Sequence, residues 1–202
     1  MDAAYPSRLR GLMPAVGACL KPSRLRSLGL VQHDPTLWGE IRVGGEVLRI
    51  PYRQYDRPPG AGVSAAFRLQ MRSGLLMSHG LEGDARLVWL AWFTRSDDGW
   101  IRQTAVRELF GQPREWLVPY LVQLLGEYVI EICSDIADFV EGTVTTDPAW
   151  AQAFSRFWAA NPGFVTLTRA RAGSYWNEYY RRRLGFADYP SARALRVLDG
   201  LT

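Results

Sequence analysis

The chain has 202 residues, of which 48% are apolar and 22% are charged. This composition is typical of a folded globular chain and excludes a disordered polymer. A chain of this length buries about 70% of the surface that it exposes when unfolded, so it needs neither a disulfide nor a metal ion to fold. Its longest uninterrupted apolar run, residues 87–93, is far shorter than the roughly 20 residues of a membrane-spanning helix. We therefore expect no membrane span.

The formal net charge is +4, and the charges are unevenly distributed along the chain. Lys21 is the only lysine among the 24 basic residues. Residues 127–147 carry six acidic and no basic residues, whereas residues 169–196 carry seven arginines and two acidic residues. This segregation predicts that an acidic helix pairs with a basic helix inside the molecule. A nucleic-acid surface formed by the arginines is the alternative.

The first 36 residues show neither helical nor strand periodicity, and we expect a tail or a loop that covers the domain. The remainder, residues 37–202, is predicted to be a single helical domain. Two cysteines, Cys19 and Cys133, do not make a disulfide framework or a zinc site. This cysteine usage indicates a reducing compartment, so we expect a cytoplasmic location.

A β-hairpin is predicted over residues 37–52. Two β-rich runs, 37–43 and 46–52, flank the pair Gly44-Gly45. Two-residue hairpin turns require a positive φ at both central positions, which glycine adopts without strain. Because an isolated hairpin is only marginally stable, we expect it to pack against the helices that follow.

Everything after about residue 62 is predicted to be helical. Apolar residues recur at three- and four-residue steps between positions 117 and 140, and this pattern favours one long helix. An aspartate or an X-Pro pair marks the start of several helices. An aspartate side chain accepts hydrogen bonds from the free N–H groups of the first turn, and proline has a fixed φ that suits the first helical position. The other expected helices cover about 84–94, 100–110, 148–160 and 162–185, with a short one from 190.

The sequence contains no convincing catalytic or cofactor motif. The glycines of segment 60–65 fit a dinucleotide fingerprint by letter, but Arg57-Pro58-Pro59 precedes them where a buried strand is required. Neither His33 nor His79 follows a glutamate by three residues, as a carboxylate-bridged two-metal bundle would need. We expect no catalytic residue, no cofactor and no metal ligand, and an enzyme is not the favoured interpretation.

Three carboxylates, Glu127, Glu131 and Asp135, stand four residues apart beside the apolar stripe of the predicted long helix. Carboxylates in such a row repel one another unless cations lie near them, and Arg169 and Arg171 are the candidates. The leading interpretation of this acidic strip is structural ion pairing. A divalent-metal or acid/base site and a partner-binding strip are the alternatives.

Segment 174–183 (SYWNEYYRRR) interleaves aromatic and basic residues, as single-strand binding surfaces do. Consecutive helical residues point in different directions, so the four aromatic residues are not expected to form one platform. The favoured interpretation is core packing that ends in solvated arginines. The alternative is a basic and aromatic surface composed of Arg169, Arg171, Tyr179, Arg181, Arg182 and Arg183.

Five segments resemble, in chain order, an uncharacterised family of bacterial helical proteins: 47–55 (VLRIPYRQY), 94–109 (TRSDDGWIRQTAVREL), 116–132 (WLVPYLVQLLGEYVIEI), 161–183 (NPGFVTLTRARAGSYWNEYYRRR) and 186–190 (FADYP). Within them, Asp98-Gly99-Trp100-Ile101-Arg102 is similar to one HEAT-type helical pair, in which an aspartate caps the turn and an arginine follows it. The resemblance implies an irregular HEAT-like helical stack with a small N-terminal β-hairpin, since no second copy follows.

Two functions follow from these observations. The absence of catalytic motifs and the helical pair favour a non-catalytic protein-interaction or scaffolding module whose protein partner is unidentified. The alternative is a nucleic-acid-binding protein that uses the arginines of the C-terminal helices.

Overall fold

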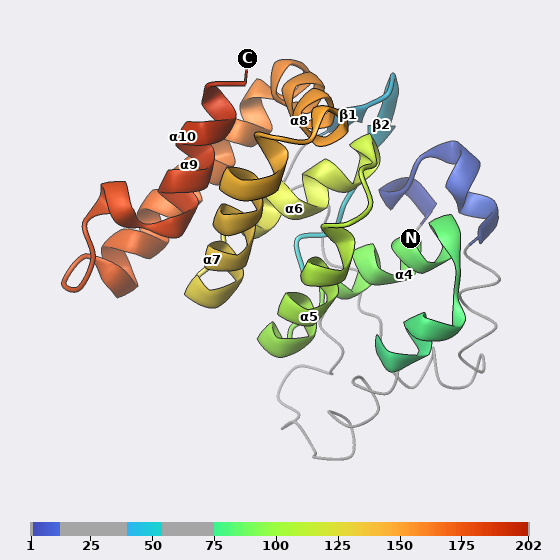
Figure 1. The fold of residues 1–202 in the computed structure, drawn as a ribbon, viewed down its shortest axis with the longest axis horizontal. Coiled ribbons are helices and arrows are strands. Elements are labelled where there is room, and N and C mark those ends of the chain that lie inside the picture. The colour runs from blue at the N-terminus through green and yellow to red at the C-terminus, as the bar shows by residue number, and fades with distance from the viewer. Residues whose placement is uncertain (1, 13–39, 54–74, 202) are drawn as a thin grey trace. The chain divides into compact units, whose positions relative to one another are not determined.

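A computed structural model describes residues 2–12, 40–53 and 75–201 (Figure 1). The described part is mainly helical and contains a two-stranded hairpin near the N-terminus, which confirms the predicted fold class at that level. The chain divides into two compact units, one formed by residues 1–37 and 48–109 and the other by residues 38–47 and 110–202. Most of the predicted N-terminal tail, together with Cys19, Lys21, His33 and the glycines of segment 60–65, lies outside the described residues.

The first unit is built around one apolar helix. It contains the 3₁₀ helices η1 (Asp2–Ala4), η2 (Ser7–Leu12) and η4 (Met77–Gly80), and the helices α4 (Gly83–Phe93) and α5 (Gly99–Leu109). Residues 87–91 of α4 are all buried, as expected for a helix that is apolar on nearly every side. Tyr5 is fully buried beside this helix and donates a hydrogen bond to the carbonyl of Val88 (3.2 Å).

The turn between α4 and α5 is fixed by side chains that bind its backbone. Asp98 caps α5, as predicted, because its Oδ1 accepts hydrogen bonds from the N–H groups of Trp100 (2.9 Å) and Ile101 (3.4 Å). Arg102 is buried and donates to the carbonyl of Ser96 (2.8 Å). Arg53, also buried, donates to the same carbonyl (3.3 Å). The aspartate and the arginine of the helical-pair motif thus stabilise one turn.

The hairpin forms where the sequence predicts it, with shorter strands. Strands β1 (Ile41–Val43) and β2 (Glu46–Leu48) are joined by Gly44 (φ 57°) and Gly45 (φ 84°), so both turn residues have the positive φ that the turn requires. Asn161, which is buried, holds β1 to the helical part of the second unit. Its side chain accepts from the N–H of Arg42 (2.7 Å) and donates to the carbonyl of the same residue (2.8 Å).

The second unit contains the remaining helices. They are η5 (Glu115–Leu117), α6 (Val118–Leu124), α7 (Ile130–Phe139), the π-helical turn η6 (Val140–Val144), α8 (Pro148–Ala160), α9 (Pro162–Tyr175), the π-helical turn η7 (Trp176–Tyr180), η8 (Phe186–Asp188) and α10 (Pro190–Asp199). The start of α8 is as predicted, because Asp147 accepts from the N–H groups of Ala149 and Trp150 and Pro148 occupies the first helical position.

The prediction of one long helix between positions 117 and 140 is wrong. A turn over residues 125–129 separates α6 from α7. Gly126 lies in this turn, where an added Cβ would come within 3.4 Å of the Arg171 Cβ. The apolar spacing continues through the turn because these residues remain part of the core, so periodicity alone gave no sign of the break.

Candidate binding surface

The acidic strip is not a single row in the structure. Glu127 lies in the turn before α7 and is fully buried, Glu131 is exposed in the first turn of α7, and Asp135 is half-buried one turn later. The carbonyl of Glu127 accepts a hydrogen bond from the hydroxyl of Tyr189 (3.3 Å). An acid in the first turn of a helix, as Glu131 is, stabilises the helix dipole without any partner.

The cations expected beside the strip make other contacts. Arg169 forms a two-pronged ion pair with Asp199 at 2.9 and 3.1 Å. Arg171 donates to the carbonyl of Gly126 (3.3 Å), in the turn that contains Glu127, and to the hydroxyl of Tyr175 (3.2 Å). The expectation that Arg169 neutralises the strip is therefore wrong, whereas Arg171 does reach the turn.

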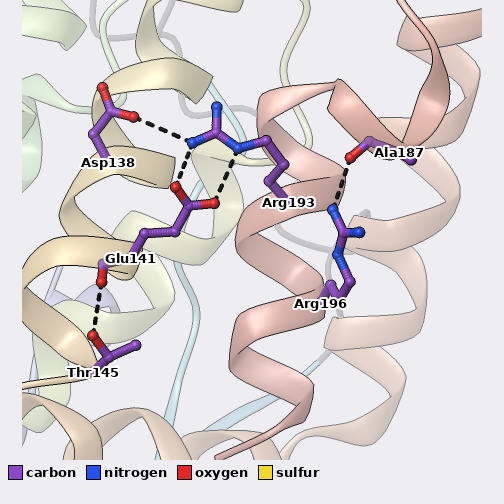
Figure 2. Close-up of polar contacts among 6 residues, drawn as sticks. All are labelled: Asp138, Glu141, Thr145, Ala187, Arg193 and Arg196. Carbon is purple, nitrogen blue, oxygen red and sulfur yellow. Dashed lines mark hydrogen bonds and ion pairs between the residues drawn. The ribbon is translucent and has the colours of Figure 1, made fainter.

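The predicted pairing of the acidic segment with the basic segment is confirmed at residues that follow the acidic strip in the chain, Asp138 and Glu141. Arg193 of α10 binds Glu141 through two nitrogens and lies 3.6 Å from Asp138 (Figure 2). The figure shows that the guanidinium of Arg193 points from α10 toward both carboxylates. A planar guanidinium suits this two-pronged geometry. These charges are satisfied within the unit.

A buried polar group lies at the start of α10, where it meets α7 and the turn before it. The thiol of Cys133 is fully buried and contacts the carbonyls of Leu124 and Glu127, both at 3.7 Å. Burial raises the pKa of this thiol to about 11 and that of the nearby Tyr189 hydroxyl above its usual value. At neutral pH both groups are protonated, so neither is poised to act as a nucleophile or a base.

The aromatic residues of segment 174–183 divide into two groups. Trp176 and Tyr180 are half-buried: the Trp176 indole donates to the carbonyl of Leu184 (2.8 Å) and contacts Phe186. The Tyr180 ring stacks on the buried Tyr189 at 5.6 Å, and its centre lies 6.3 Å from that of Tyr179. Tyr175 and Tyr179, one turn apart, stack on each other with ring centres 6.2 Å apart and an interplanar angle of 27°. Only Tyr179 is exposed, so the four rings form no single exposed platform, as predicted. The favoured expectation of core packing is wrong, because none of the four rings is buried: the segment lies at the edge of the unit, where its rings contact one another and Phe186.

Tyr128 joins the outward pair from another part of the chain. It lies in the turn between α6 and α7, and its ring centre is 6.0 Å from that of Tyr175 and 6.2 Å from that of Tyr179. The hydroxyl of Tyr180 donates to the carbonyl of Tyr128 and holds the turn in place. Tyr128 is 47% exposed and Tyr179 is 56% exposed. Sequence analysis missed Tyr128, because its spacing placed it in a buried helical stripe.

Arginines border this tyrosine cluster. The Arg171 guanidinium lies 5.7 Å from the centre of the Tyr175 ring, within cation–π distance. Arg181, Arg182 and Arg183 continue directly from η7 as one more turn, and all three are exposed. Arg181 donates to Asn177 (3.1 Å), and no carboxylate in the described part of the chain forms an ion pair with any of the three.

We call this region the Tyr–Arg surface. It comprises Tyr128, Tyr175, Tyr179, Arg171, Arg181, Arg182 and Arg183. All of it belongs to the second unit, and the end of α9 with the loop that follows lies at one end of that unit, drawn orange-red in Figure 1. Of the predicted basic and aromatic residues, Arg169 is left out of this definition, because its charge is paired with Asp199.

Two further observations concern other classes of site. Within residues 2–12, 40–53 and 75–201, no group of three or more His, Cys, Asp or Glu side chains is arranged to hold a metal ion. None of the helices in these ranges has the length and apolar character needed to cross a membrane.

The chain matches no protein-family model, and no curated protein or solved structure is significantly similar to it.

Proposed function

We propose that this chain is a non-catalytic binding module that contacts its partner through the Tyr–Arg surface. The observation that carries this proposal is the exposure of Tyr128 and Tyr179 beside three arginines that no described carboxylate neutralises. Tyrosine and arginine are the residue types most enriched at the energetic centres of binding interfaces. Neighbouring exposed aromatic rings are uncommon on a surface that has no partner, which supports a role in recognition.

The helical pair of the first unit is also consistent with a binding or scaffolding role. Helices α4 and α5 form a packed pair that an Arg86–Glu108 ion pair links, and Asp98 and Arg102 fix their turn. The sequence of this turn, Asp98-Gly99-Trp100-Ile101-Arg102, resembles that of a HEAT-type helical pair. Helical pairs of that type present surfaces to partners and need no chemically special residue.

The test compares what purified variants capture from an extract of the native cell, with protein and nucleic acid both analysed. The full chain and Arg8→Gln, which removes an exposed charge in the first unit, should recover the same macromolecule. A triple variant, Arg181→Gln with Arg182→Gln and Arg183→Gln, should lose it. Equal recovery by all three proteins would contradict the proposal.

A further inference from the structure

We propose that the ligand of the Tyr–Arg surface is single-stranded nucleic acid, an inference that rests on the proposed binding function and names its partner class. The surface combines two kinds of group that this ligand requires together. Tyrosine rings offer faces on which unpaired bases stack, and arginines offer planar donors that match phosphate oxygens.

The tyrosines provide a stacking platform. The Tyr175 and Tyr179 rings are stacked with an interplanar angle of 27°, and Tyr128 extends the cluster from a second segment of the chain. The outer members, Tyr128 and Tyr179, keep about half of their surface exposed. The hydrogen bond from Tyr180 to the Tyr128 carbonyl and the contacts among the three rings position the cluster before any ligand binds. A preformed platform lowers the entropy cost of binding.

The arginines supply the complementary charge. Arg181, Arg182 and Arg183 follow Tyr179 within about one helical turn, so a strand whose bases stack on the tyrosines has its phosphates within reach of the guanidinium groups. Arg171 of α9, over the Tyr175 ring, adds positive charge on the other side of the tyrosines along the chain. Glu178 is the one acidic residue between positions 174 and 184, and Glu131 is exposed in the first turn of α7. Local charge therefore remains positive along segment 179–183.

The same features argue against two other ligands. In a duplex the faces of the bases are hidden by stacking, so the tyrosine platform would be unused. An acidic peptide would pair with the arginines but offers no row of planar rings to the tyrosines. Single-stranded nucleic acid is the ligand that engages both halves of the surface.

The experiment measures fluorescence anisotropy of labelled oligothymidylate and oligouridylate of about 15 nucleotides with the full chain. We expect binding whose logarithmic salt dependence between about 50 and 200 mM has a slope of about −2, corresponding to three phosphate contacts. Tyr179→Ala should weaken binding on the order of tenfold, since stacking contributes about 1–3 kcal/mol per base. Tyr179→Phe keeps the ring and should bind as the wild type does.

Matched controls separate stacking and local charge from general charge. Arg182→Gln should weaken binding and make the salt slope less steep by about 0.7, whereas Arg8→Gln, with the same loss of charge in the first unit, should leave the slope unchanged. Trp100→Ala removes an exposed aromatic residue of the first unit and should not alter affinity. Polyglutamate should compete poorly, and a duplex of the same sequence should bind more weakly than either single strand.

Absence of binding to both oligonucleotides at low salt would overturn the inference, as would binding that Tyr179→Ala leaves intact. If the oligonucleotides do not bind while the triple arginine variant still loses a captured protein, the ligand inference fails and the proposed binding function stands. If the triple variant alters neither measurement, both fail.

Discussion

The contact between α7 and α10 and the Tyr–Arg surface both contain arginine and tyrosine. In the contact these residues are paired or buried, whereas on the surface they are exposed. In the contact, Arg193 is bound to Glu141 and lies close to Asp138, and the tyrosine beside it, Tyr189, is fully buried. On the surface, Arg181, Arg182 and Arg183 face solvent, and Tyr179 is more than half exposed. The comparison teaches that residue type alone does not distinguish architecture from recognition. The two roles are distinguished by whether each arginine or tyrosine has its partner inside the molecule.

The largest expected effect is the loss of an apolar side chain from the closed contact. Leu195 of α10 is 2% exposed, so Leu195→Ala removes buried surface and leaves a cavity. We expect unfolding free energy to fall by about 2–5 kcal/mol, measured by urea denaturation. A loss below about 1 kcal/mol would mean that α10 is not firmly packed, and the contact between α7 and α10 could then not be contrasted with the exposed Tyr–Arg surface.

The ion pair of the contact should contribute less. Arg193→Ala removes both prongs of the bond to Glu141, in which each side chain is about one-third exposed. Because solvent screens such a pair, we expect a loss of about 1–2 kcal/mol that shrinks at high salt. Arg193→Lys keeps the charge without the fork and should fall between wild type and alanine. An equal loss at low and high salt would show that packing, not charge, is the source.

A second ion pair, Arg169–Asp199, joins α9 to the end of α10 and gives the stability of the second unit a pH dependence. Burial opposes ionisation of Asp199, but hydrogen bonds from Arg169 and Trp158 outweigh it and lower the pKa of this carboxyl. A carboxyl whose pKa is lower in the folded state stabilises the fold above its unfolded pKa of about 3.9 and ceases to do so as pH falls through its folded pKa. Asp199→Asn should thus be less stable than wild type at pH 6, and the difference should vanish in strong acid. A constant difference would contradict this.

Alkylation of Cys133 measures how well the contact between α7 and α10 excludes solvent, and it requires no substitution in that contact. Its burial and raised pKa predict that alkylation at pH 8 is far slower than for a free thiol and becomes fast only on unfolding. A Cys19→Ser background isolates the signal. Rapid alkylation of the native protein would show that the α7–α10 contact opens readily.

The smallest effect belongs to the acidic strip. Glu131 is exposed and no described cation pairs with it, so Glu131→Ala should change stability by about 0.5 kcal/mol or less in thermal melts. This differs from the expectation of a buried ion pair, under which the melting temperature would fall clearly. A large fall would restore that expectation.

Local chemistry made several features predictable. Gly44 and Gly45 specify a turn that only positive φ allows, Asp98 and Asp147 cap the helices that they precede, and Pro190 starts the last helix. Each depends on neighbours within a few residues. The break between α6 and α7 was not predictable, because Leu125 and Val129 preserve the apolar spacing through a turn whose backbone is held by Arg171 from a distant helix.

Only part of the candidate site could be predicted from the sequence, because some of its residues depend on local sequence and others on tertiary packing. Tyr179 and the arginines that follow it stand out locally, and the structure leaves them exposed. Tyr128 was missed because its place depends on the turn, and the choice of Asp199 for Arg169 and Glu141 for Arg193 depends on how α10 packs. Ion-pair partners follow from tertiary structure, which charge patterning along the sequence does not specify.

The most direct test of the account measures one variant, Tyr179→Ala, in two ways. If the Tyr–Arg surface is open and serves recognition, thermal unfolding should match the wild type while affinity for a single-stranded oligonucleotide falls on the order of tenfold. A clear loss of stability with unchanged affinity would show that the ring is structural and would contradict the account.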